Sequence, residues 1–368
     1  MTLYYALLFI IPFLVWIGIA KTFFHFDFSW GEVAIQSFVT MAVILFIFAT
    51  GSASQTRDTK IVNGVVTQLE PKQKNCPSGW VSSSDSFCTE YRTRSVKVGE
   101  SCSTVNKVRT CTPIYKTEYN YDYPWERRYF VKTDIDTTFE IDRVDRQGSN
   151  TPPRFFEIVI GDPVAISVPY TNYIKGASES LFNKTYEELP PIAYPKIRDY
   201  YKVYRFLVYG VEFNADDFNQ WNKKIAQLNS NVRKTGANFV LIVTKDNQNF
   251  GEMMAQAWDA HNINDIVATV GMDGNNVEWV DVRSWSDNSI VEVEIRDSIL
   301  NIGTLDIDKI TATVEQSIME GFQLKSMDDF EYLAEDIPPP TWAIVLALIV
   351  LIIITPVVTY IFNKYDVI

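Results

Sequence analysis

The sequence contains only two histidines, His25 and His261, in 368 residues. It also lacks the short motifs of several common enzyme classes: no P-loop, GxSxG nucleophile elbow, HExxH helix or GxGxxG turn is present. A Ser-His-Asp triad in the large central region would therefore have to use His261. This histidine lies at the end of a predicted helix, where a histidine often simply interacts with the helix dipole. These absences favour a non-catalytic role for it.

Charged residues are absent from three long apolar segments, residues 1–20, 33–50 and 341–362. Each has roughly the 20 residues that a helix needs to cross the hydrocarbon core of a bilayer. The first segment has no basic region before it and no small-residue cleavage pattern after it, so we expect it to stay in the mature protein. Charged residues within a membrane usually mark an ion or substrate path, and their absence argues against a transporter. The sequence therefore predicts three transmembrane helices.

Three crossings determine which parts of the chain share a side of the membrane. The hairpin loop at residues 21–32 and the tail at residues 363–368 would lie on one side, and residues 51–340 on the other. Basic residues tend to stay in the cytoplasm, but those beside the segments fall on both sides, so charge alone does not orient the protein. They are Lys21 and Lys364 on one side, and Arg57 and Lys60 on the other.

The cysteines give the orientation. All four lie within 36 residues, at Cys76, Cys88, Cys102 and Cys111. An even, clustered number predicts two disulfides and an oxidising compartment. A zinc site fits less well, because the gaps are wide, no CxxC pair occurs and both histidines are distant. Three pairings are possible, of which a Cys102–Cys111 hairpin bond is one. We therefore expect the central region to be periplasmic or extracellular and the C-terminus to be cytoplasmic.

The central region is acidic. Residues 51–340 contain 31 basic and 42 acidic residues, which gives a net charge of −11. This sign argues against nucleic acid or anionic lipid headgroups as partners of the soluble part. A simpler interpretation is that the charge maintains solubility.

Composition divides the central region into two parts. Residues 58–151 alternate polar residues with Val, Tyr, Thr and Phe, a pattern typical of half-buried strands, and predict a β-rich domain containing the disulfides. Turn-forming residues follow at 152–203, which predicts a linker of loops and short strands with a glycosylation sequon at residues 183–185. Residues 204–333 alternate helical and strand patterns, which predicts an α/β sandwich.

The order of elements in residues 204–333 resembles the TPM domain family. The resemblance rests on a helix leading into RKTGANFVLIVTKD, a helix with AQAWDAHNIND, the strand pair IVATVGMDGN and VEWVDVRSW, a late helix and a C-terminal membrane segment. It implies an αβα sandwich held at a membrane. Members include a plant thylakoid lumen protein, a nematode acetylcholine-receptor accessory protein and bacterial membrane-anchored proteins. Glycines that many members have after the second helix and after the paired strands are replaced here by residues 262–264 and 283–285.

The resemblance also suggests a calcium site. Acidic side chains at strand ends could bind a hard divalent cation such as Ca²⁺, which takes carboxylate and carbonyl oxygens. The candidate ligands are Asp246, Asp265, Asp273 and Asp281. The alternative is that Asp246 and Asp273 only form turns, while Asp265 and Asp281 are exposed strand ends.

Two functions remain open. In the first, the chain is a membrane-anchored accessory protein, whose outer region binds a protein partner in or near the same membrane within a homo- or hetero-oligomeric assembly. In the second, the α/β part is a metal-dependent hydrolase acting on phosphate esters, since family members have been assigned acid phosphatase activity. The sequence shows no nucleophile-and-base arrangement, which favours the first hypothesis.

Overall fold

The computed structural model describes residues 10–24, 29–105, 108–141, 153–181, 186–198 and 202–365. His25, the sequon at 183–185 and the last three residues of the expected tail lie outside the described residues. The chain divides into two compact units. The first unit consists of Met1–Val62, Ile166–Ile197 and Val203–Ile368, and the second of Asn63–Ala165 and Arg198–Lys202.

Three apolar helices belong to the first unit: α2 (Ile10–Phe23), α3 (Trp30–Gln55) and α11 (Thr341–Tyr365). Within the described residues, two segments are long and apolar enough to cross a membrane, Trp30–Gln55 and Thr341–Ile361. The third is described only from Ile10, and its apolar helix is shorter there. The structure thus confirms two of the three expected spans as candidates. Helix α3 begins with a capping box, in which Ser29 Oγ accepts from the Glu32 N–H and Glu32 Oε2 accepts from the Ser29 N–H.

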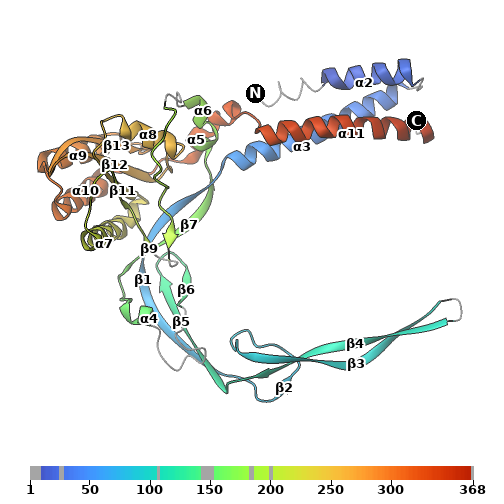
Figure 1. Ribbon diagram of the computed structural model, residues 1–368, viewed down its shortest axis with the longest axis horizontal. Helices are drawn as coiled ribbons and strands as arrows, with labels where there is room; N and C mark the ends of the chain where they lie inside the picture. Colours follow the sequence, from blue (N-terminus) through green and yellow to red (C-terminus); the bar gives the residue numbers. More distant parts are fainter. Residues whose placement is uncertain are drawn as a thin grey trace. The chain divides into compact units, whose positions relative to one another are not determined.

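The apolar helices pack against one another (Figure 1). Gly51 of α3 allows a close approach, because a Cβ at this position would lie 2.9 Å from the Cβ of Ala343 on α11. Their buried contact cluster contains Phe13, Ile44, Ile47, Phe48, Ala343, Ala347 and Leu351.

Polar contacts also join these helices. The Gln36 Nε2 donates to the backbone oxygen of Thr355 at 2.9 Å and to Thr359 Oγ1 at 2.7 Å. Thr359 Oγ1 also accepts from the indole N–H of Trp16 on α2, at 3.2 Å. Hydrogen bonds of this kind each contribute modestly to helix association, so the three apolar helices are held together mainly by side-chain packing.

The β-rich part contains two sheets and both predicted disulfides. The four-stranded sheet has the order β6-β5-β1-β7, and the three-stranded sheet the order β2-β4-β3. Cys76 bonds Cys88 and Cys102 bonds Cys111, so the hairpin pairing is confirmed. The elements here are β1 (Arg57–Asn75), β2 (Trp80–Val81), β3 (Tyr91–Val105), β4 (Val108–Tyr121), β5 (Trp125–Thr133), β6 (Thr138–Ile141), α4 (Pro153–Glu157) and β7 (Pro163–Thr171).

Short elements follow β7, as the turn-rich composition predicts. They are α5 (Tyr173–Gly176), α6 (Ser178–Leu181), β8 (Ile197–Arg198) and β9 (Lys202–Val203).

The first unit also contains a four-stranded sheet with helices on both faces. Strands β10, β11 and β12 are parallel, and β13 runs antiparallel to β12. All seven residues of β11 are buried, as expected for a strand covered on both faces. The strands are β10 (Phe206–Tyr209), β11 (Asn238–Thr244), β12 (Asp265–Asp273) and β13 (Asn276–Ser284), and the helices are α7 (Ala215–Asn231), η1 (Arg233–Thr235), α8 (Phe250–Ala257), α9 (Ile290–Ile302), α10 (Ile307–Gly321) and η2 (Met327–Asp336).

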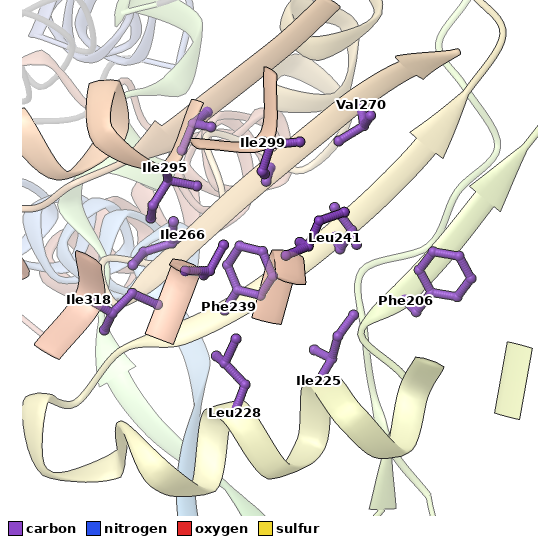
Figure 2. Packing of buried hydrophobic residues seen from close by; sticks show 14 of the residues in the cluster. Phe206, Ile225, Leu228, Phe239, Leu241, Ile266, Val270, Ile295, Ile299 and Ile318 are labelled. Atoms are coloured by element: carbon purple, nitrogen blue, oxygen red, sulfur yellow. The ribbon is translucent and has the colours of Figure 1, made fainter. Parts of the chain in front are cut away.

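The larger core lies between this sheet and helices α7, α9 and α10 (Figure 2). Figure 2 shows Ile225 and Leu228 of α7 beside Phe239 of β11, with Ile295 of α9 near Ile266 of β12. On the other face, α8 packs through Phe250 and Met254 against Val240, Ile242 and Val267. Alternate residues of β11 therefore enter opposite cores, which gives the expected sandwich of helices around a sheet.

Candidate functional site

The four candidate calcium ligands do not converge. Asp265 is the first residue of β12. Asp246 comes shortly after β11 and Asp273 is the last residue of β12, so these two lie at the opposite end of the parallel strands. Asp281 lies inside β13, paired with Thr269. Among the described residues, none of the four belongs to a group of three or more side chains whose ligand atoms could hold one metal ion. The calcium site thus gains no support from the geometry.

Each of the four has another local role or environment. Asp246 forms a turn, in which its N–H donates to Thr244 Oγ1 at 3.1 Å and its carbonyl accepts from Trp279 Nε1 at 3.1 Å. Asp273 pairs with Asn276 across the β12–β13 turn. The Asp281 carboxylate accepts from Arg283 Nε at 2.7 Å. The turn interpretation therefore fits Asp246 and Asp273.

Asp265 is fully buried, which corrects the interpretation of an exposed strand end. Its carboxylate accepts hydrogen bonds from Tyr194 Oη at 3.0 Å, from Asn238 Nδ2 at 2.8 Å and from the Asn262 N–H at 2.8 Å. Arg205 Nε donates to Asn238 Oδ1 at 2.7 Å. Burial raises the pKa of Asp265 to about 6 and lowers the pKa of Arg205 to about 10.

The sequence does not predict this buried polar network. Tyr194 comes from the turn-rich stretch, 71 residues before Asp265, and Arg205 stands just before β10. The only sequence signal was a polar residue at the start of each buried strand, Asn238 in β11 and Asp265 in β12. The network joins segments that are distant in sequence: the turn-rich stretch, the start of β10 and the starts of β11 and β12.

His261 lies beside this network in an unusual turn. Asp259, Ala260 and His261 have φ values of 46°, 71° and 51°, a left-handed conformation that costs roughly 1–2 kcal/mol per non-glycine residue. Trp285 Nε1 stabilises the turn by donating to the Ala260 carbonyl at 2.9 Å, and the His261 N–H donates to Trp258 O at 2.9 Å. The turn ends α8 at Ala257, earlier than the sequence pattern predicts.

The His261 ring is buried and neutral. Its Nδ1 lies 3.3 Å from the Asn262 carbonyl, and burial lowers its pKa to about 4. No described carboxylate forms a hydrogen bond or ion pair with the ring, so the described residues do not complete a Ser-His-Asp triad around it. The ring lines a polar pocket of about 260 Å³ together with Asp58, Lys175, Tyr194, Trp258 and Asn262.

In the second unit, β3 and β4 form a long ribbon (Figure 1). The strands pair from Tyr91–Tyr121 to Val105–Val108. In residues 91–103 and 109–117, every side-chain position is exposed except Val96 and Gly99, which are half-buried. Neither face of this part of the ribbon is covered by described residues, although three large apolar side chains lie on it. These are Val98, Ile114 and Tyr115, with exposed fractions of 58%, 48% and 61%.

The ribbon is also basic, unlike the rest of the chain. Residues 91–121 contain six basic and two acidic residues, a net charge of +4 in a chain with a net charge of −12. Arg94 forms an ion pair with Glu118 at 2.7 Å, and Lys97 pairs with Glu100. The exposed side chains of Arg109 and Lys116 form no ion pair with any residue that the structure describes.

Comparisons with known proteins found no matching family model, no matching curated protein and no matching solved structure. The TPM resemblance therefore stays a prediction from the sequence.

Proposed function

We propose that the chain is a membrane-anchored protein whose β3–β4 ribbon binds an acidic protein partner. The observation that carries this proposal is a long ribbon with both faces exposed. A two-stranded ribbon has no core of its own and is marginally stable in water, so one that retains exposed apolar side chains is best explained by a partner that covers them. The Cys102–Cys111 bond would keep the ribbon ordered before the partner arrives.

The charge of the ribbon supports an acidic partner. A patch of +4 on a chain of −12 favours association with negatively charged surfaces and speeds their encounter. The rest of the chain carries −16 by difference, which disfavours a nucleic acid as the partner.

The location of the partner follows from the membrane segments. Both candidate spans adjoin the central region of residues 51–340, which contains the disulfides, because α3 leads into β1 and η2 leads towards α11. Disulfides persist in oxidising compartments, which supports an extracytoplasmic position for this region. A partner in or near the same membrane is then within reach, as part of a homo- or hetero-oligomeric assembly. The hydrolase hypothesis gains no support from the described residues, because the four acidic candidates do not converge and no described carboxylate pairs with the His261 ring.

The test is site-specific photo-crosslinking in cells. A benzophenone amino acid replaces Tyr115 on the ribbon or, as a control, Met319, which is 54% exposed on α10. We expect a discrete crosslinked protein from position 115 and none from position 319. The double variant R109E/K116E, or 0.5 M NaCl added to isolated membranes, should remove the crosslink, because the attraction is screened within about 10 Å or less.

A matched variant separates the effect of charge on the ribbon from the effect of the net charge of the whole chain. K223E/K234E makes the same change in net charge at two exposed lysines of the other unit. It should leave the crosslink at position 115 intact. Equal crosslinking at both positions, or equal loss in both charge variants, would contradict partner binding through the ribbon.

A further inference from the structure

Most of the polar residues that line a second pocket in the first unit carry hydrogen-bond donors. Its volume is about 480 Å³, and its walls come from the start of β1, from the end of β7 with α5, and from the segment before η2. The polar side chains that line it are Lys60, Tyr170, Thr171, Tyr173, Lys325, Ser326 and Asp328. The last of these is exposed and is the only carboxylate in the lining. The pocket therefore has the composition of an anion site rather than a cation site.

Lys60 brings to this pocket a positive charge that no described carboxylate neutralises. Its side chain is half-buried and forms no ion pair with a described residue, and its Nζ lies 5.5 Å from the centroid of the Tyr170 ring. Such a lysine is unexpected in a chain with 45 acidic and 33 basic residues. A half-buried ammonium without a carboxylate loses hydration that an anionic ligand would replace.

Lys325 supplies a second positive charge from a different element. Its Nζ lies 3.6 Å from the Asp287 carboxylate and 5.2 Å from the Phe330 ring centroid. The exposed fraction of the Asp287 side chain is 63%, so this pair is screened by water and weak. Two ammonium groups from separate segments, together with hydroxyl groups that line the same pocket, match the several oxygens and the charge of a phosphoryl group.

The pocket lies near the points where the chain leaves the apolar helices. Lys60 is four residues after Thr56, the residue that caps α3. A Cβ on Gly176, at the end of α5, would lie 3.0 Å from Thr56 Cγ2 and 2.7 Å from Ile337 Cδ1, and Ile337 is four residues before α11. Tyr173 of the same short helix lines the pocket. A headgroup at the bilayer surface would therefore be close to it.

We propose that this pocket binds a phosphoryl group, either of a phospholipid headgroup or of a free phosphate. The proposal is independent of the ribbon and its partner. The net charge of −11 on residues 51–340 opposes anions in general, so binding here would depend on the local arrangement of Lys60 and Lys325.

The experiment measures binding of two probes to the full-length protein in a non-ionic detergent. Equilibrium dialysis uses radiolabelled inorganic phosphate and, separately, radiolabelled dihexanoyl phosphatidylglycerol below its micelle concentration. We expect one saturable site per chain for at least one probe. Lys60→Gln should weaken it by about tenfold, the loss of one charge-assisted hydrogen bond, while Lys60→Arg keeps most of the affinity.

Controls make the result decisive. Lys223→Gln removes an exposed charge outside the pocket and should leave binding unchanged. Lys325→Gln provides an independent variant on the other wall, should Lys60→Gln not fold. Tighter binding of the lipid or of free phosphate identifies which of the two supplies the phosphoryl group. No saturable binding of either probe, or equal weakening by the pocket variants and Lys223→Gln, would overturn the proposal.

Discussion

Two titratable side chains, Asp265 and His261, are buried with opposite consequences for stability. Burial raises the pKa of Asp265 to about 6 and lowers that of His261 to about 4. The folded state therefore holds the Asp265 proton more tightly than the unfolded state does, and the His261 proton less tightly. The two effects fall in the same range, about pH 4 to 6.5, and oppose each other.

We therefore predict a pH dependence that single variants reveal. The contribution of Asp265 is present below about pH 4 and is lost as the pH rises through 6. That of His261 is present above about pH 6.5 and is lost as the pH falls through 4. Each shift of roughly two pKa units corresponds to about 3 kcal/mol in the free energy of unfolding, so the contributions of these two side chains should nearly cancel between pH 4 and 6.5.

The measurement is the melting temperature of the protein in detergent, with unfolding monitored by tryptophan fluorescence. In Asp265→Asn only the His261 effect remains, so the melting temperature should rise from pH 4 to 6.5. In His261→Asn, which keeps a residue that tolerates positive φ, it should fall over the same range. Parallel curves for the wild type and both variants would show that neither side chain is titrated as described.

At the scale of elements, the sequence predicted those whose pattern is local. The run at residues 238–244 is a fully buried strand, and the hairpin of β12 and β13 turns at Gly274 as its composition indicates. The apolar residues of the segment at 290–302 fit both the helical and the strand period, so its sequence does not choose between them. It is helix α9, which ends at Gly303 with φ 72°.

What the sequence could not predict depends on contacts between distant segments. Tyr194 meets Asp265 only after the turn-rich stretch packs against the sheet. The close approach of α3 to α11 likewise depends on the absence of a side chain at Gly51, opposite Ala343. No local pattern contains this information, because either partner alone is unremarkable in its own segment.

Close packing of α3 against α11 depends on the small size of Gly51. In Gly51→Leu the new side chain would collide with Ala343 and Pro340 and separate α3 from α11, at a cost of roughly 1–3 kcal/mol. We expect a lower melting temperature of the detergent-solubilised protein. Gly18→Leu on α2 is the matched control, since a Cβ there meets nothing within 4 Å. If both variants melt alike, the close packing at Gly51 does not contribute to stability.

At the scale of the whole molecule, orientation across the membrane is the prediction to test. Cys102 and Cys111 are exposed, whereas Cys88 is buried. A membrane-impermeant maleimide should therefore label nothing in intact cells until mild reduction, and should then label Cys102 and Cys111 before Cys88. Labelling that requires cell lysis but no reductant would instead place this region in a reducing compartment.

Strand β1 begins at Arg57, two residues after α3 ends at Gln55, and runs without interruption to Asn75. It pairs antiparallel with β5 from Val66 to Asn75, so its hydrogen bonds lie across the strand direction. A pull on α3 along the strand would load these bonds together, in shear, rather than one at a time. Only Thr56 lies between α3 and β1, so tension on α3 would pass directly to β1 and to the hydrogen bonds that join it to β5.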